Sequence, residues 1–127
     1  MASEEIVNEW LKLGKEDLEL SEHLIKEGWF YRAALSHLQQ AVEKYTKAFL
    51  ISKDWELRKI HDLEVLLDEA AKYEPKFKKY VELGRSLTAF YTESRYPPLN
   101  EDQPSKKEAE KLLSATKQFV KEIEKII

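Results

Sequence analysis

The sequence contains no cysteine, and it holds only three glycines and four prolines among 127 residues. The absence of cysteine excludes a disulfide scaffold and a zinc site built on thiolates. The scarcity of glycine and a charged fraction of 35% favour helices that are joined by short loops. A chain of this length is most simply one domain, residues 1–127, with a single hydrophobic core.

Long apolar runs and a targeting segment are also missing. No run approaches the roughly 20 apolar residues that span a bilayer, and no basic region followed by an apolar stretch opens the chain. We therefore expect no membrane partner and a cytoplasmic location. The net charge is −3, with lysine and glutamate interspersed. This balance argues against a protein that coats nucleic acid nonspecifically.

The familiar catalytic motifs are absent as well. The sequence has no glycine-rich phosphate loop, no HExxH and no cysteine–histidine pairing. A di-iron carboxylate bundle needs glutamate three residues before a histidine, and none of the three histidines has one. We therefore expect neither a metal nor another cofactor.

The stretch from residue 31 to residue 52 predicts a long amphipathic helix at the centre of a bundle. At about 100° per residue, its apolar side chains fall in one arc, within which alanine recurs every seven residues and lets a neighbouring helix approach closely. The opposite side carries Ser36, Gln40, Glu43 and Lys47. Glu43 and Lys47 are four residues apart, which is typical of a surface ion pair worth about 0.3–0.5 kcal/mol.

Four further helical segments surround this one. A first helix is predicted over residues 4–27, with Gly28 as its left-handed cap. A short third helix begins near His61 or Asp62, a fourth runs from Pro75 to near residue 94, and a last one follows a capping box at residues 105–108. The predicted fold is an all-α, antiparallel up-and-down bundle of four long helices plus one short helix.

Asp17 interrupts an apolar pattern in the first helix. Ile6, Leu13 and Leu20 repeat at seven residues, and Trp10, Asp17 and Leu24 repeat beside them. One interpretation places Asp17 at the edge of the stripe, with its carboxylate in water or beside a lysine or arginine. The other is a partly buried carboxylate that orients a residue of a functional site.

Four stretches of the chain carry a resemblance to a known family. The run ALSHLQQAVEKYTKAFL at residues 34–50 resembles the second helix of the HEPN family. Glu-Asp-Leu at 16–18 is similar to that family's opening pattern, and His-Asp-Leu at 61–63 to the start of its third helix. Ser-Arg-Tyr-Pro at 94–97 resembles its arginine-tyrosine-proline element. The four matches come in the family's order and span nearly the whole chain.

The resemblance implies a helical bundle that usually dimerises, and it implies three activities. These are nucleotide binding, partnership with a small nucleotidyltransferase in a toxin–antitoxin-like context, and metal-independent RNA cleavage. The nuclease branch uses an arginine, a polar residue after it and a histidine four to six residues beyond the arginine. Here Arg95 is followed by Tyr96, and Asn100 or Asp102 stands where the histidine is expected. This departure favours a binding module over an enzyme, and an enzyme would be an endoribonuclease with Arg95 as its phosphate anchor.

A second arginine–histidine pair fits the same spacing. Arg32 and His37 are separated by four residues, but Ala33 follows the arginine and the pair lies at the start of the second helix. We interpret His37 as a structural histidine at the border of the apolar arc.

The fourth helix carries its own candidate site. Arg85 and Arg95 share a helical stripe with two threonines, and two arginines on one face can bind phosphate bidentately. Tyr91 or Tyr96 could stack on a base. The alternative is that the arginines pair with nearby glutamates such as Glu82, or with carboxylates of a partner subunit.

The sequence therefore predicts a nucleotide- or RNA-associated binding module that forms a homodimer. Its predicted ligand-binding residues are Arg95, Arg85, Tyr91, Tyr96, His61, Gln40, Glu43, Lys44 and Lys47. His61 remains open between a role in capping and packing and a role in the site. The alternatives are a metal-independent ribonuclease toxin and a non-catalytic adaptor that binds a nucleotidyltransferase.

Overall fold

The structure of the chain, a computed structural model, describes residues 4–94 and 104–127. In these ranges the chain forms five α-helices and one 3₁₀ segment, without a strand. They are α1 (Glu4–Glu27), α2 (Tyr31–Ser52), α3 (Leu63–Tyr73), η1 (Pro75–Tyr80), α4 (Val81–Ser94) and α5 (Lys106–Ile126). The predicted all-α bundle is confirmed, and no helix in the described ranges is both long and apolar enough to cross a bilayer.

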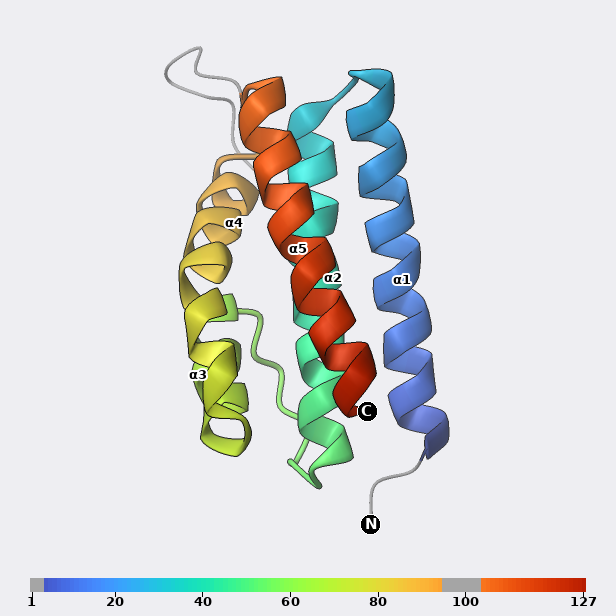
Figure 1. Cartoon of the computed structure of the whole chain (residues 1–127), viewed down its shortest axis with the longest axis vertical. Helices are drawn as coiled ribbons and strands as arrows, with labels where there is room; N and C mark the ends of the chain where they lie inside the picture. The colour runs from blue at the N-terminus through green and yellow to red at the C-terminus, as the bar shows by residue number, and fades with distance from the viewer. Residues whose placement is uncertain (1–3, 95–103) are drawn as a thin grey trace.

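The predicted central helix is at the centre of the bundle. α2 packs against α1, α3, α4 and α5 (Figure 1). Its three heptad-spaced alanines, Ala34, Ala41 and Ala48, have no exposed surface. At Gly14 of α1, an added Cβ would lie 2.8 Å from Cδ2 of Tyr45. A glycine at this position therefore allows α1 to lie directly against the Tyr45 ring.

An aromatic cluster fills the core on the other side of α2. The ring centroids of Phe49 and Phe77 are 5.0 Å apart, and those of Phe77 and Phe119 are 5.8 Å apart, both in edge-to-face geometry. Tyr80 completes the cluster, 5.0 Å from Phe119. These rings join α2, η1 and α5, so three segments that are distant in sequence share one core.

The helix ends follow their local signals. Gly28 has a φ of 77° and ends α1, as predicted. The Asp62 carboxylate accepts a hydrogen bond of 2.9 Å from the Glu64 amide at the start of α3. Ser105 and Glu108 form the predicted capping box of α5. The predicted fourth helix is divided, because its first six residues after Glu74 form η1 before α4 begins.

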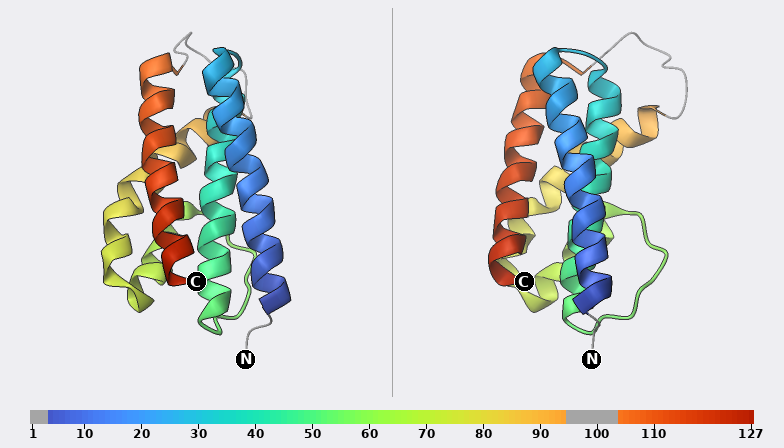
Figure 2. Two further views of the ribbon diagram at one scale, coloured as in Figure 1. Left: turned by 45° about the vertical axis from the view of Figure 1, so that its right-hand side comes forward. Right: turned by 90° about the vertical axis from the view of Figure 1, so that its right-hand side faces the viewer.

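α1 lies at one edge of the bundle, packed along α2 (Figures 1 and 2). Its buried residues include Val7, Gly14 and Ser21. The neighbouring stripe of Ile6, Leu13 and Leu20 therefore points outward, and each of these side chains is more than 40% exposed. Only one side of an edge helix is covered, so this stripe of its apolar pattern faces solvent.

Candidate functional site

An open cavity of about 740 Å³ lies at the N-terminal end of α2. Its lining combines two basic side chains, a hydroxyl and two aromatic rings with small apolar residues: Phe30, Tyr31, Arg32, Ala33, Ser36, His37 and Pro104. The C-terminal end of α4 lies at this same end of the bundle (Figure 1). The described chain resumes after that helix at Pro104, which is itself part of the cavity wall.

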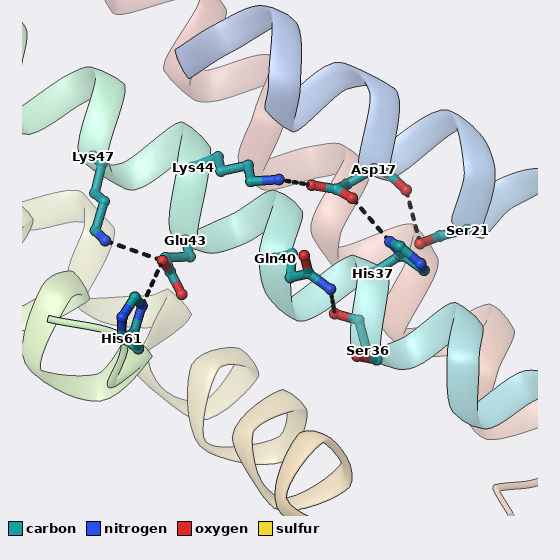
Figure 3. A network of polar contacts seen from close by, with 9 residues as sticks. All are labelled: Asp17, Ser21, Ser36, His37, Gln40, Glu43, Lys44, Lys47 and His61. Carbon is teal, nitrogen blue, oxygen red and sulfur yellow. Dashed lines mark hydrogen bonds and ion pairs between the residues drawn. The ribbon is translucent and has the colours of Figure 1, made fainter. Parts of the chain in front are cut away.

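His37 is held in this cavity by a carboxylate of α1. Nδ1 of His37 lies 2.9 Å from Oδ1 of Asp17, and Oδ2 of Asp17 accepts a hydrogen bond of 2.5 Å from Nζ of Lys44 (Figure 3). Asp17 is buried, whereas the His37 side chain keeps 32% of its surface exposed. Asp17 therefore contacts a lysine, as the first interpretation proposed, and also orients a neighbouring histidine, as the second did.

The contact with Asp17 determines how the imidazole of His37 can act. An ionised carboxylate only accepts hydrogen bonds, so Nδ1 of His37 carries the proton in this pair. Nε2 is then left for other partners. It accepts a proton when the ring is neutral, and it donates to an anion when the ring is charged.

A buried hydroxyl supports the same part of the fold. Oγ of Ser21 donates to the backbone carbonyls of Asp17, at 2.9 Å, and of Ala34, at 2.8 Å. The second bond ties α1 to the first turns of α2, beside the cavity. The positions of Asp17 and His37 are thus fixed by the packing of two helices.

The backbone at the start of α2 favours an anion. Phe30 occupies the N-cap position and provides no side-chain hydrogen bond to the first amides of the helix. The first turn contains no acidic residue. The helix dipole gives this end a partial positive charge, which adds to that of Arg32.

A second polar cluster lies farther along α2. Oε2 of Glu43 is 3.0 Å from Nζ of Lys47 and 3.0 Å from Nδ1 of His61 (Figure 3). The Lys47 side chain is only 4% exposed and the Glu43 side chain 12% exposed. The prediction of an ordinary surface pair is therefore wrong, because the Trp10 ring of α1 lies 5.4 Å from Nζ of Lys47 and His61 also contacts Glu43.

The predicted polar face of α2 is thus mostly occupied by internal contacts. Lys44 is bound to Asp17, and Lys47 to Glu43. The side-chain amide of Gln40 lies 3.5 Å from the Ser36 carbonyl. His61 contacts Glu43 on this face, and the residue that caps α3 is Asp62 rather than His61. None of Gln40, Glu43, Lys44, Lys47 and His61 lines the cavity.

The predicted arginine stripe of α4 lies apart from this polar face. Arg85 is exposed, and its guanidinium donates to Glu82 and, at 2.6 Å, to Oε1 of Glu64. The hydrogen bond with Glu64 raises the pKa of Arg85. These contacts match the ion-pair interpretation of Arg85. Arg95, Tyr96 and the side chain of Tyr91 lie outside the described residues.

None of the residues that line the cavity belongs to the predicted ligand-binding set. The spacing of Arg32 and His37 is visible in the sequence, but by itself it favours a structural role for His37. Phe30 and Tyr31 gave no signal in the sequence pattern. Asp17 was singled out because a carboxylate interrupted an apolar stripe. The pairing of Asp17 with His37 depends on the register of α1 against α2, which no local pattern gives.

The described residues contain no group of three or more metal-ligating side chains that could hold a metal ion. The cavity itself combines the oriented imidazole of His37, the guanidinium of Arg32 and the N-terminus of α2 with aromatic rings. Such groups can bind a phosphate and an attached ring.

Comparison with known proteins agrees with this fold. The sequence model of the HEPN domain matches residues 7–126, so the chain belongs to the HEPN domain family. The structure is similar to the crystal structure of ST0689, described as an archaeal HEPN homologue. That similarity has a TM-score of 0.72 at 25% identity and covers 93% of this chain and 94% of that one.

A second solved structure has the same fold. The crystal structure of TT1696 from Thermus thermophilus is 22% identical in sequence, with a TM-score of 0.77, over 95% of this chain and 98% of that one. No curated protein sequence matches the chain at a significant level.

Proposed function

We propose that this HEPN chain is a nucleotide- or RNA-associated binding module that holds a phosphate in the cavity at the start of α2. One observation carries the proposal: Arg32, Ser36 and His37 line one open cavity, where Asp17 orients the imidazole. The proposed site thus differs from the predicted set, which combined Arg85 and Arg95 with the polar face of α2.

Each group in the cavity has a distinct task in this proposal. The guanidinium of Arg32 binds phosphate oxygens through two parallel donors. The hydroxyl of Ser36, and Nε2 of His37 when both ring nitrogens carry protons, donate to the remaining oxygens. Arg95, which directly follows α4 in the chain, stays in the proposal as a further phosphate contact.

Thermal melting against a panel of nucleotides tests the proposal. A ligand at a hundred times its dissociation constant adds about 2.7 kcal/mol to the free energy of unfolding, which raises the melting temperature by several degrees. We expect this shift in the wild type, and its loss in Arg32→Ala and His37→Ala. Arg95→Ala should reduce it.

Arg85→Ala is the matched control, since it removes an arginine that pairs with Glu64 outside the cavity. It should keep the full nucleotide shift. If no nucleotide raises the melting temperature of the wild type, the proposal is wrong. If the shift in melting temperature is lost in Arg85→Ala but kept in Arg32→Ala, the phosphate site lies at the arginine stripe of α4 instead.

A metal-independent ribonuclease is the second candidate, favoured by the Asp17–His37 pair beside Arg32. In this reaction Nε2 of neutral His37 takes the proton of a ribose 2′-hydroxyl, whose oxygen attacks the adjacent phosphorus. The bond from phosphorus to the 5′-oxygen breaks, and that oxygen takes a proton from water. The products are a 2′,3′-cyclic phosphate and a 5′-hydroxyl, and the arginine neutralises the transition-state charge.

Incubation of unstructured RNA with the protein and a metal chelator decides this candidate. A ribonuclease would leave cyclic-phosphate ends with the wild type and intact RNA with His37→Ala. Intact RNA with both proteins would end the enzymatic hypothesis, while nucleotide binding would stand.

Association with other chains belongs to the same proposal. The outward stripe of Ile6, Leu13 and Leu20 on α1 supports a homodimer or an adaptor role toward a nucleotidyltransferase, in a toxin–antitoxin-like context in the cytoplasm. The mass in solution should be that of a dimer, and Leu13→Glu should yield the monomer. A monomeric wild type would favour the adaptor.

A further inference from the structure

The turn between α1 and α2 presents two consecutive aromatic side chains to solvent. Trp29 is 60% exposed and Phe30 is 72% exposed. Rings of this size contribute most to stability when they are buried. Phe30 also lines the cavity that contains Arg32 and His37, so its exposed ring adjoins the proposed phosphate site.

The backbone of Phe30 is strained. Its φ of 51° and ψ of 52° lie in the left-handed region, which costs an ordinary L-residue about 1–2 kcal/mol. Glycine and asparagine adopt this conformation readily. Phe30 therefore gains little from burial and loses free energy through its backbone. Strain of this kind gathers at functional sites, where the side chain has a use outside folding.

We propose that Phe30, flanked by Trp29, is the stacking surface for an unpaired nucleobase whose phosphate lies at Arg32 and His37. This inference rests on the proposed function and names the ligand class more closely. The ligand is a purine or pyrimidine that carries a phosphate, either as a free nucleotide or as a residue of single-stranded RNA.

The cavity has both chemical characters that such a ligand needs. Arg32 and His37 provide charged or polar donors, and the rings of Phe30 and Tyr31 provide an apolar wall. Base–aromatic stacking is worth about 1–3 kcal/mol per base. At about 1.4 kcal/mol for each factor of ten, stacking makes a nucleotide bind roughly 5- to 150-fold more tightly than a sugar phosphate without a base.

Titration calorimetry with AMP and ribose 5-phosphate separates the base from the phosphate. For the wild type we expect AMP to bind at least about fivefold more tightly than ribose 5-phosphate. Phe30→Asn removes the ring and suits the left-handed backbone, so it should fold with unchanged or higher stability and bind both ligands equally. Phe30→Tyr keeps a ring and should preserve the preference for AMP.

The outcomes distinguish this inference from the proposed function. Equal affinity of the wild type for AMP and ribose 5-phosphate overturns the stacking surface but leaves the phosphate site intact. Binding of neither ligand overturns both. If Phe30→Asn changes a dimer into a monomer and keeps the preference for AMP, a second copy covers the ring and the inference is wrong.

A last comparison identifies the source of the base. If six-residue oligoadenylate binds more tightly than AMP, and the same strand in a duplex does not bind, the ligand is single-stranded RNA. Equal binding of the hexamer and AMP assigns the free nucleotide. Both results support stacking on Phe30, whereas a preference for the duplex contradicts it.

Discussion

Asp17 of α1 and His37 of α2 are joined by a contact of 2.9 Å between Oδ1 and Nδ1, across the interface that organises the bundle. The same carboxylate binds Lys44 through its other oxygen. One buried acidic side chain thus links helix packing to the orientation of a cavity residue. Changes at Asp17 should affect stability and binding together.

Asp17→Asn should lower the free energy of unfolding by about 1–3 kcal/mol, because it leaves Lys44 without its counter-charge. It should also weaken nucleotide binding, since His37 loses its fixed orientation. Urea denaturation and calorimetry measure the two effects. Glu22→Gln is the control, because the more exposed Glu22–Lys117 pair contributes less than about 1 kcal/mol. Equal stability losses in the two variants would contradict the role of Asp17.

Glu43→Gln should destabilise the protein by about 3 kcal/mol, because it leaves the buried ammonium of Lys47 without a charged partner. His61→Ala removes the other contact of Glu43, but that ring is 72% exposed, and the loss should stay below about 1 kcal/mol. The double variant Glu43→Leu/Lys47→Met should recover most of the stability. A loss below about 1 kcal/mol for Glu43→Gln in denaturant unfolding would contradict the role of the Lys47 pair.

Gly14→Ala should destabilise the protein although alanine is the better helix former. A Cβ at this position would lie 2.8 Å from the buried Tyr45 ring, and overpacking costs about 1–3 kcal/mol against a propensity gain of about 1 kcal/mol. Lys15→Ala, at the exposed next position, should be nearly neutral. A higher melting temperature for Gly14→Ala would contradict the close approach of α1 and α2.

Alkaline pH should destabilise the fold through Tyr45. Burial, with smaller contributions from Glu124 and Glu19, raises the pKa of Tyr45 from 10.0 to about 12. The unfolded chain therefore ionises first, so the contribution of Tyr45 is full below pH 10 and is lost as the pH rises toward 12. The loss is about 1.4 kcal/mol per unit, or roughly 2–3 kcal/mol in total. Tyr45→Phe should lack this part of the pH dependence in unfolding experiments, and an unchanged slope would contradict it.

The helices were predictable because their signals are local. Gly28, Asp62 and the Ser105 capping box end or begin helices through contacts within a few residues. The central place of α2 followed from its wide apolar arc. The division between η1 and α4 was missed, because Pro75 is compatible with the first turn of either kind of helix.

The site was harder to predict, because it depends on contacts between helices. The Trp10 ring that lies near Lys47 belongs to α1, and the partner of His37 lies twenty residues earlier. The arginine–histidine spacing at the start of α2 was visible in the sequence. Without Asp17 and the cavity, that spacing did not distinguish a structural histidine from one in a site.

The most direct measurement follows the backbone amides of the ¹⁵N-labelled protein by NMR while AMP is added. The account predicts that the largest shifts occur at residues 30–37, and that Arg32→Ala removes them. Residues on the face between η1, α4 and α5, such as Leu83 and Lys111, should stay unchanged. Shifts confined to that face, or no shifts at millimolar AMP, would contradict a phosphate site at the start of α2.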